Sequence, residues 1–340
     1  MTGGPAPALP AAMRVHIQNL PGEALFAVTP VQWRAALDRH GGDHDVSLAE
    51  DDAGFSAAIR EAQVLVTWTK QVRARLVGAD LRAMAPRLRV ISCTSAGLDR
   101  LAPFDWLPPH VLLLNNRGAH ADKAGEFALM GLLMLAAGMP RIAAAQRAKR
   151  WEPRFGSVLA GRRLAVVGLG TIGGAAARHA RAHGMRVTGI RTRAEPHPDC
   201  DEVRATEDLD AVLPEAEFLA LCCPLTEATR GLIDRRRLSL LARGAKVLNM
   251  SRGAVWDQDA ACDLLDAGHL DGCVTDVAVP EPLPPGHRLW RTPGMTVVPH
   301  VSSDDPATYN DRTLDILLAN LDAIAAGRPA PNRVDPARGY

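Results

Sequence analysis

Hydrophobic and polar positions alternate along this chain in blocks that predict an α/β protein. Short apolar runs typical of buried strands are separated by amphipathic helical patterns, for example from Val31 to His40. The first four runs occupy residues 13–18, 64–68, 88–94 and 111–116. A link near Trp151 follows them, and then the alternation restarts.

Six further apolar runs follow that link, with helical or irregular segments between them. They are LAVVGLG, MRVTGI, FLALCC, AKVLNM, GCVTD and MTVVP. This alternation predicts a doubly wound parallel sheet, with a smaller α/β unit before it in the chain. An amphipathic pattern from Tyr309 to Ala326 predicts a last helix that returns to the smaller unit.

The longest apolar stretch runs from Ala124 to Met139 and contains Glu126. It is shorter than the ~20 residues that a membrane span requires. Apolar residues on all its faces predict a helix buried between domains or subunits, so we expect no membrane partner. The first twelve residues are rich in Gly, Pro and Ala, and they predict a flexible lead-in rather than a signal peptide.

Length and charge narrow the classes of partner. With 340 residues the chain is long enough for two domains. A formal net charge of +1 offers no general attraction to nucleic acid or to an anionic membrane. The six cysteines form no CxxC pair, which favours reduced thiols in a cytoplasmic protein over disulfides or metal ligands.

A glycine-rich motif carries the first chemical signal. Gly168, Gly170 and Gly173 form a GxGxxG that follows an apolar run and precedes a helical pattern. In a dinucleotide-binding unit these glycines allow a tight turn, a close approach to a pyrophosphate and close helix packing. Thr171 and Ile172, within the motif, are further candidates for cofactor binding, and the N-terminus of the following helix favours the phosphates.

The residue that selects between NAD and NADP is expected about 20 residues further on, at the end of the second strand. Arg191, Thr192 and Arg193 occupy that place, where a carboxylate would bind the ribose of NAD. A guanidinium can instead bind a 2′-phosphate. We therefore predict that NADP(H) is preferred and NAD(H) possible; the alternative is that both arginines are ordinary surface residues.

The chain from His16 to Asn332 resembles the D-isomer-specific 2-hydroxyacid dehydrogenase family. The resemblance rests on ordered motifs: TSAGLD, NNRGAHADKAGEFAL, VVGLGTIGG, CPLTEATRGLI, LNMSRGAVWD, TDVAVPEPLP and VVPH. It implies a Rossmann domain, residues 114–304, inserted into a smaller flavodoxin-like substrate domain, residues 1–113 and 305–340. It also implies a homodimer and a small 2-oxo or 2-hydroxy acid as substrate, such as glyoxylate or hydroxypyruvate.

Three residues match the family's catalytic set. His300 follows an apolar strand, and histidine is well suited to give a proton to a carbonyl oxygen near neutral pH. Glu281 matches the carboxylate that pairs with this histidine and stabilises its protonated form. Arg252 matches the residue that binds the substrate carboxylate, a task that suits a guanidinium fork.

The resemblance also implies binding roles for other residues. Ser95, Ala96 and Gly97 match the loop whose backbone N–H groups bind the substrate carboxylate. Pro224 and Thr226 match a loop along the cofactor, and Asp276 matches a residue near the nicotinamide carboxamide. Trp68 is either a wall of the substrate pocket or a core residue. No metal site is predicted.

The chain departs from the family pattern at two places. Gly125 replaces a common alanine, which weakens a helix by about 1 kcal/mol. VSSDD follows His300 where many relatives have small residues and a threonine. Two other functions stay open: a phosphite-type dehydrogenase, and a dinucleotide-sensing interaction protein. A formate enzyme is disfavoured, because such relatives usually have Gln in place of Glu281.

Overall fold

The computed structural model describes residues 10–339, and these form two compact units. The first unit extends to Ala119 and resumes at Asp305, and the second runs from His120 to Asp304. The first boundary lies a few residues beyond the expected one, because the strand at 112–114 and the turn after it pack with the first unit. The expected flexible lead-in falls mostly outside the described residues.

The first unit contains a five-stranded parallel sheet with strand order β2-β1-β3-β4-β5. This is the flavodoxin-like order of doubly wound folds. Its strands are β1 (Arg14–Gln18), β2 (Asp45–Ala49), β3 (Val64–Thr67), β4 (Val90–Cys93) and β5 (Leu112–Leu114). The apolar pattern predicts four of them. It misses β2, an edge strand whose residues are all partly or fully exposed.

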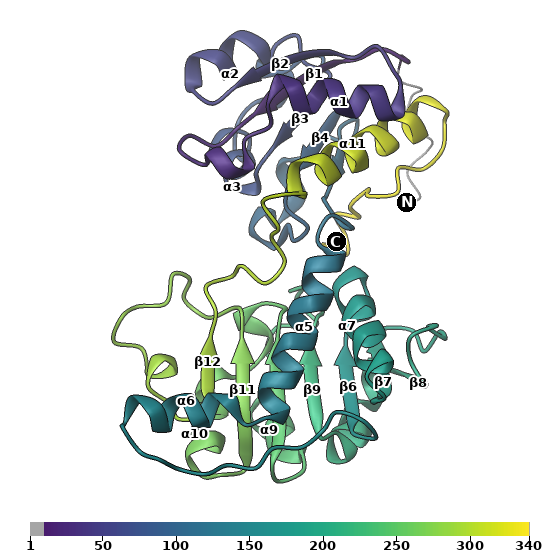
Figure 1. Cartoon of the computed structure of the whole chain (residues 1–340). Helices are drawn as coiled ribbons and strands as arrows, with labels where there is room; N and C mark the ends of the chain where they lie inside the picture. Colours follow the sequence, from purple (N-terminus) through teal and green to yellow (C-terminus); the bar gives the residue numbers. More distant parts are fainter. Residues whose placement is uncertain (1–9, 340) are drawn as a thin grey trace. The chain divides into compact units, whose positions relative to one another are not determined.

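Helices cover this sheet, and the last helix of the chain is one of them. Figure 1 shows α11 beside α1, which confirms the predicted return of residues 309–326 to the smaller unit. The capping box of Thr29 and Gln32 starts α1. The helices are α1 (Pro30–His40), α2 (Asp52–Ala58), α3 (Thr69–Arg75), α4 (Leu81–Met84) and α11 (Tyr309–Ala325), with 3-10 turns η1 (Ala24–Phe26), η2 (Asp99–Leu101) and η3 (Phe104–Trp106).

The second unit contains a seven-stranded parallel sheet with order β12-β11-β10-β9-β6-β7-β8. Counted within the unit, this is the Rossmann order with one added edge strand. The strands are β6 (Arg163–Val167), β7 (Arg186–Arg191), β8 (Glu202–Ala205), β9 (Phe218–Leu221), β10 (Ala245–Asn249), β11 (Leu270–Thr275) and β12 (Met295–Val297). The doubly wound prediction is confirmed. The short polar edge strand β8 was not predicted, because its residues are exposed or half-buried.

Helices lie on both faces of this sheet (Figure 1). They are α5 (Ala121–Ala136), α6 (Met139–Arg147), α7 (Thr171–Ala182), α8 (Leu209–Val212), α9 (Arg235–Leu240) and α10 (Gln258–Asp266), with 3-10 turns η4 (Thr206–Asp208), η5 (Leu213–Glu215), η6 (Gly253–Val255) and η7 (Arg288–Trp290). Two hydrophobic cores result, one on each face of the sheet.

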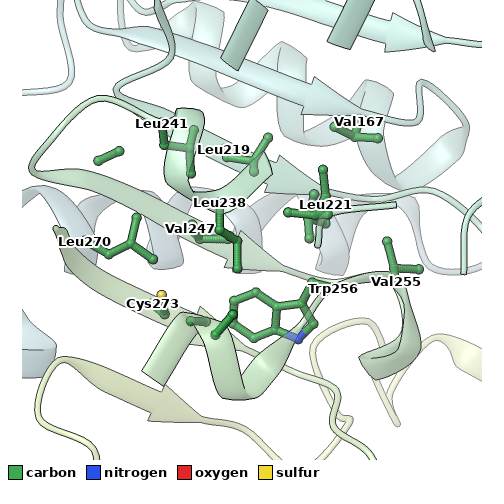
Figure 2. Close-up of a cluster of buried hydrophobic side chains, with 14 of the residues drawn as sticks. Val167, Leu219, Leu221, Leu238, Leu241, Val247, Val255, Trp256, Leu270 and Cys273 are labelled. Atoms are coloured by element: carbon green, nitrogen blue, oxygen red, sulfur yellow. The ribbon is translucent and has the colours of Figure 1, made fainter. Parts of the chain in front are cut away.

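Alternate residues of the central strands supply the two cores. In β9, Leu219 and Leu221 enter one core, whereas Phe218 and Ala220 enter the other. Figure 2 shows Leu219 and Leu221 in the first core, which also contains Trp256. Each fully buried leucine stabilises the unit by about 2 kcal/mol. The cores hold the carboxyl ends of the strands in place, and the candidate site residues follow those ends.

The long apolar stretch forms two helices rather than one. Gly138 has a positive φ of 71°, a conformation that glycine adopts readily, and the turn there separates α5 from α6. No single helix in residues 10–339 is both long and apolar enough to cross a membrane; α5 and α6 pass that test only together, and they are bent by 66°.

Gly125 has a packing reason. A Cβ on this residue would lie 2.6 Å from the His179 ring on α7, so the glycine lets the two helices approach.

The two ends of the second unit are in contact through His120. His120 lies 3.2 Å from the backbone oxygen of Ser303 through Nδ1, and 3.5 Å from Oδ1 of Asp304. The His120 ring is 91% shielded from solvent. Burial lowers its pKa, and the Asp304 carboxylate opposes that shift. The first and last residues of the unit therefore lie side by side.

Candidate active site

The glycine-rich motif forms the turn between β6 and α7. Gly168 has a φ of 92°, and a Cβ there would lie 2.6 Å from Cα of Cys223 on the neighbouring loop. A Cβ on Gly173 would lie 1.8 Å from the backbone oxygen of Gly168. These two glycines are therefore required by the fold of the turn.

Gly170 is different, because a Cβ there would meet no atom within 4 Å. The space beside its backbone is open. Gly170 is also the N-cap of α7, and no side chain caps this 12-residue helix; Thr171 and Ile172 form its first turn and are half-buried. Free N–H groups and open space at a helix N-terminus suit the pyrophosphate of a dinucleotide.

The arginines follow the second strand of this unit. Arg191 is the last residue of β7, and its side chain is 35% exposed. Its Nη2 atom lies 3.6 Å from Oε2 of Glu195, four residues further on. Thr192 and Arg193 are exposed. The structure therefore reveals a carboxylate near Arg191 that the sequence reasoning did not consider.

The loop after β9 carries the next pair of candidates. The Thr229 hydroxyl lies 2.7 Å from the backbone oxygen of Pro224, to which it donates, and it accepts from the Thr226 amide at 2.8 Å. The same loop packs against the glycine turn at Cys223. Pro224 and Thr226 thus belong to a hydrogen-bonded turn next to the turn of the glycine motif.

Arg252 lies after β10 and is half-buried. It is the N-cap of η6, and its Nη1 donates to the backbone oxygen of Ser251 at 2.8 Å. A Cβ on Gly253 would lie 2.3 Å from the backbone carbon of Ala278, so the loops after β10 and β11 are in close contact.

His300 and Glu281 form a pair after the last two strands of the sheet. Nδ1 of His300 lies 3.1 Å from Oε2 of Glu281, and Oε1 of Glu281 accepts from the amide of Ala278 at 3.0 Å. The imidazole is 44% exposed, whereas the carboxylate is 22% exposed. One ring nitrogen is thus engaged by a carboxylate, while the ring as a whole is accessible.

Asp276 follows β11 and is 2% exposed. Oδ1 accepts from the amides of Val301 at 2.9 Å and Ser302 at 3.1 Å, and Oδ2 accepts from the Ser302 hydroxyl at 2.5 Å. Burial raises the pKa of this carboxyl, and the Ser302 hydrogen bond opposes the rise. Ser302 was not a sequence candidate, and no motif could have indicated it.

The remaining candidates belong to the first unit. Ser95, Ala96 and Gly97 are half-buried and lie in the loop after β4, at and just after a bend over residues 94–96. Trp68 follows the adjacent strand β3 and is also half-buried. Its ring stacks on Tyr309 with centroids 6.0 Å apart, and the Tyr309 hydroxyl donates to the backbone oxygen of Thr94 at 2.5 Å. The structure thus brings the bend and Trp68 to the same edge of this sheet.

A Rossmann sheet with an open helix N-terminus at its glycine turn and an accessible His–Glu pair at its carboxyl edge is the arrangement expected of a dinucleotide-dependent oxidoreductase. Comparison with known proteins gives the family. Residues 129–302 match the family model described as D-isomer specific 2-hydroxyacid dehydrogenase, NAD binding domain. The chain belongs to this family, and it is an NAD(P)-dependent enzyme.

Relatives cover most of the chain. A glyoxylate/hydroxypyruvate reductase B of Erwinia tasmaniensis is 31% identical over 329 residues, which are 93% of this chain and 99% of the relative. A glyoxylate reductase of Korarchaeum cryptofilum is 31% identical, covering 76% of this chain and 80% of the relative. A family member from Xanthobacter autotrophicus Py2, solved with NADPH and MES, has a TM-score of 0.82 at 29% identity, covering 97% of this chain and 100% of that one.

Proposed function

We propose that this protein reduces a small 2-oxo acid, of the glyoxylate or hydroxypyruvate type, to the D-2-hydroxy acid, with His300 as general acid. The observation that carries the proposal is the His300–Glu281 pair at 3.1 Å. The two residues of the pair follow strands β11 and β12, which belong to the same sheet as the glycine turn that suits a dinucleotide. Relatives named glyoxylate reductase and glyoxylate/hydroxypyruvate reductase support the substrate class.

The proton in this reaction comes from the imidazole. The nicotinamide, when bound, supplies a hydride to the carbonyl carbon. The hydrogen bond between Nδ1 of His300 and Glu281 leaves Nε2 to donate its proton to the carbonyl oxygen. The Glu281 carboxylate orients the ring and stabilises its protonated form. The hydride brings two electrons and His300 one proton, which completes the hydroxy acid.

Substrate binding is assigned to two groups of residues. Arg252 would bind the carboxylate of the 2-oxo acid and polarise its keto group through the guanidinium fork. In the first unit, the backbone of Ser95, Ala96 and Gly97 would donate to a substrate carboxylate, as the family resemblance implies. Trp68 would form an apolar wall, which its half-buried ring beside Tyr309 supports.

The test is steady-state turnover of the purified enzyme with NADPH and a panel of 2-oxo acids. His300→Ala should lower kcat by about 10²- to 10⁴-fold, because a general acid contributes that much. His183→Ala, which alters an exposed histidine of the same unit, is the matched control. Undiminished turnover of the His300 variant would remove this residue from its role.

The same assay, extended by phosphite with NADP as oxidant and by light scattering with and without cofactor, separates the two alternative functions. A phosphite-type dehydrogenase would reduce NADP with phosphite and leave the 2-oxo acids unchanged. A dinucleotide-sensing interaction protein would turn over no acid, and its assembly would change when the cofactor binds. Either result would replace the reductase proposal.

We propose that NADP(H) is the preferred cofactor. Arg191 ends β7 at the position that faces the ribose in Rossmann folds, and Arg193 is exposed two residues further on. Two guanidinium groups there suit a 2′-phosphate, and a carboxylate would repel it. The NADPH in the Xanthobacter autotrophicus relative supports this preference.

We also propose that the enzyme is a homodimer through α5 and α6. Met130, Leu133 and Met139 of these helices are 41–47% exposed, and Trp151 and Phe155 in the following segment are more than 95% exposed. Exposed apolar residues concentrated in one segment are typical of an interface. Leu133→Glu should convert the dimer to a monomer in light scattering; an unchanged mass would exclude this surface.

A reducing compartment, the cytoplasm, is the proposed location. All six cysteines lie in the described part of the chain and are free. Burial raises the pKa of the Cys93 thiol to about 12, which keeps it protonated and unreactive. Thiol titration of the enzyme from a cytosolic fraction should find six reduced cysteines, and recovery from a secreted fraction would contradict the proposal.

A further inference from the structure

The backbone of His300 has an uncommon conformation. Its φ is 55°, in the left-handed region, and Lys149 is the other non-glycine residue with positive φ in residues 10–339. Such a conformation persists only where neighbouring groups hold it. The question is therefore which groups hold His300 in this conformation.

The carboxyl end of β11 supplies the answer. The His300 amide donates to the backbone oxygens of Asp276 at 2.9 Å and Val298 at 3.0 Å. The Asp276 side chain accepts from the two following amides, those of Val301 and Ser302. Residues 300–302 are thus hydrogen-bonded to Asp276, through both its backbone oxygen and its side chain.

Ser302 completes this arrangement. Its hydroxyl donates to Oδ2 of Asp276 at 2.5 Å and lies 3.3 Å from the hydroxyl of Ser303. Ser302 is 2% exposed, as is Asp276. A buried carboxylate needs such donors, because without them burial would favour its neutral form. Both carboxylate oxygens are therefore engaged by the segment that carries His300.

We propose that Ser302 and Asp276 are positioning residues, which hold the left-handed turn at His300 and thereby aim its imidazole at Glu281. This proposal rests on the proposed role of His300. It assigns a function to Ser302, and it gives Asp276 a task besides its expected contact with the nicotinamide carboxamide.

Two substitutions distinguish the effect of the turn geometry at His300 from the effect of the Asp276 charge. Ser302→Ala keeps the Asp276 carboxylate and removes the donor that fixes Oδ2. Asp276→Asn keeps the shape: its oxygen can accept from the two amides, and its NH₂ group can donate to the Ser302 hydroxyl. The second variant therefore retains the turn and loses the negative charge near the imidazole.

The experiment measures kcat, KM, the dissociation constant of NADPH and the pH profile of kcat/KM for the full-length enzyme. Ser302→Ala should lower kcat about tenfold, since small misplacements of catalytic groups have effects of that order or larger. KM and the dissociation constant of NADPH should change by less than about twofold. Thr292→Val is the matched control, because it removes another buried hydroxyl of the unit, bonded to the backbone oxygen of Arg288.

Asp276→Asn should move the alkaline limb of the profile to lower pH. The variant removes an anion near the imidazole, and a nearby anion favours the charged form of such a ring. If Ser302→Ala behaves like Thr292→Val, or if Asp276→Asn weakens NADPH binding tenfold without moving the limb, the positioning proposal is wrong. If Ser302→Ala does not fold, Ser302→Cys is measured in its place: the thiol is a weaker donor to Oδ2 of Asp276, so kcat should again fall, and a wild-type kcat would overturn the proposal.

The His300→Ala variant keeps the two proposals apart. If it retains turnover, the proposed role of His300 fails whatever Ser302 does. If it is inactive while Ser302→Ala and Asp276→Asn keep the wild-type kcat and pH profile, only the positioning proposal fails.

Discussion

The proposed preference for NADP(H) requires that a 2′-phosphate compete with Glu195 for the guanidinium of Arg191. Arg191 lies 3.6 Å from Glu195 before any phosphate arrives. At that distance two unit charges attract by about 1 kcal/mol in bulk water. Exposed pairs of this kind contribute about 0.2–1 kcal/mol. These side chains are 35% and 58% exposed, so the pair with Glu195 is weak. We therefore expect a 2′-phosphate to displace Glu195 from Arg191.

Arg191→Ala should weaken NADPH binding roughly 10- to 150-fold, because a hydrogen bond to a charged group is worth about 1.5–3 kcal/mol. NADH binding should not change. Glu195→Gln should tighten NADPH binding by up to about fivefold, since at most about 1 kcal/mol of competition is removed. The assay is calorimetric or fluorescence titration of both cofactors at low and high salt.

Arg204→Ala is the matched control, since Arg204 is exposed on the neighbouring strand β8 and pairs with Glu202 at 2.7 Å. It should leave both dissociation constants unchanged. High salt should reduce the NADPH advantage of the wild type. If NADPH and NADH bind the wild type equally, or if Arg191→Ala weakens both alike, the assignment of Arg191 to the 2′-phosphate is wrong.

Two further predictions concern stability. Gly173→Ala should lower the free energy of unfolding by about 1–3 kcal/mol or more, because its Cβ would lie 1.8 Å from a backbone oxygen. Gly170→Ala should keep the wild-type Tm and weaken cofactor binding, because its Cβ would meet no atom of the protein within 4 Å. Equal Tm values for the two variants would contradict this prediction. Burial lowers the pKa of His16 in the folded protein below its ordinary value of 6.5. As pH falls below about 6.5, His16 therefore takes up a proton in the unfolded chain before it does so in the folded protein, and the free energy of unfolding decreases. Tm measured at pH 7.5 and 5.5 should therefore fall less for His16→Gln than for the wild type, and equal falls would exclude His16 as the cause.

The sequence predicts the parts of the fold that have a strong repeating pattern. Central strands read as continuous apolar runs because both of their faces are buried. The edge strands β2 and β8 were missed, since a short polar strand has the same composition as a loop. The doubly wound sheet was predicted, because the restart of alternation after Trp151 and the glycine motif indicate it together. Its insertion into the smaller unit was implied only by the family resemblance.

The sequence predicts some residues of the candidate site but not the contacts between them. Motifs indicate His300, Glu281 and Arg252, but single contacts have no pattern in the sequence. Glu195 near Arg191 and Ser302 on Asp276 depend on how side chains meet after folding. A serine within VSSDD is an ordinary loop residue until the structure shows that its hydroxyl is buried against a carboxylate.

The contact between the two ends of the second unit has an evolutionary and a practical consequence. Because His120 contacts Ser303, the chain enters and leaves the second unit at neighbouring points, as is typical of an inserted domain. An ancestral gene could acquire such a segment in one step without separating the strands on either side of it. For the same reason, residues 120–304 are a natural choice for expression alone, as a portable nucleotide-binding module for fusion to other proteins.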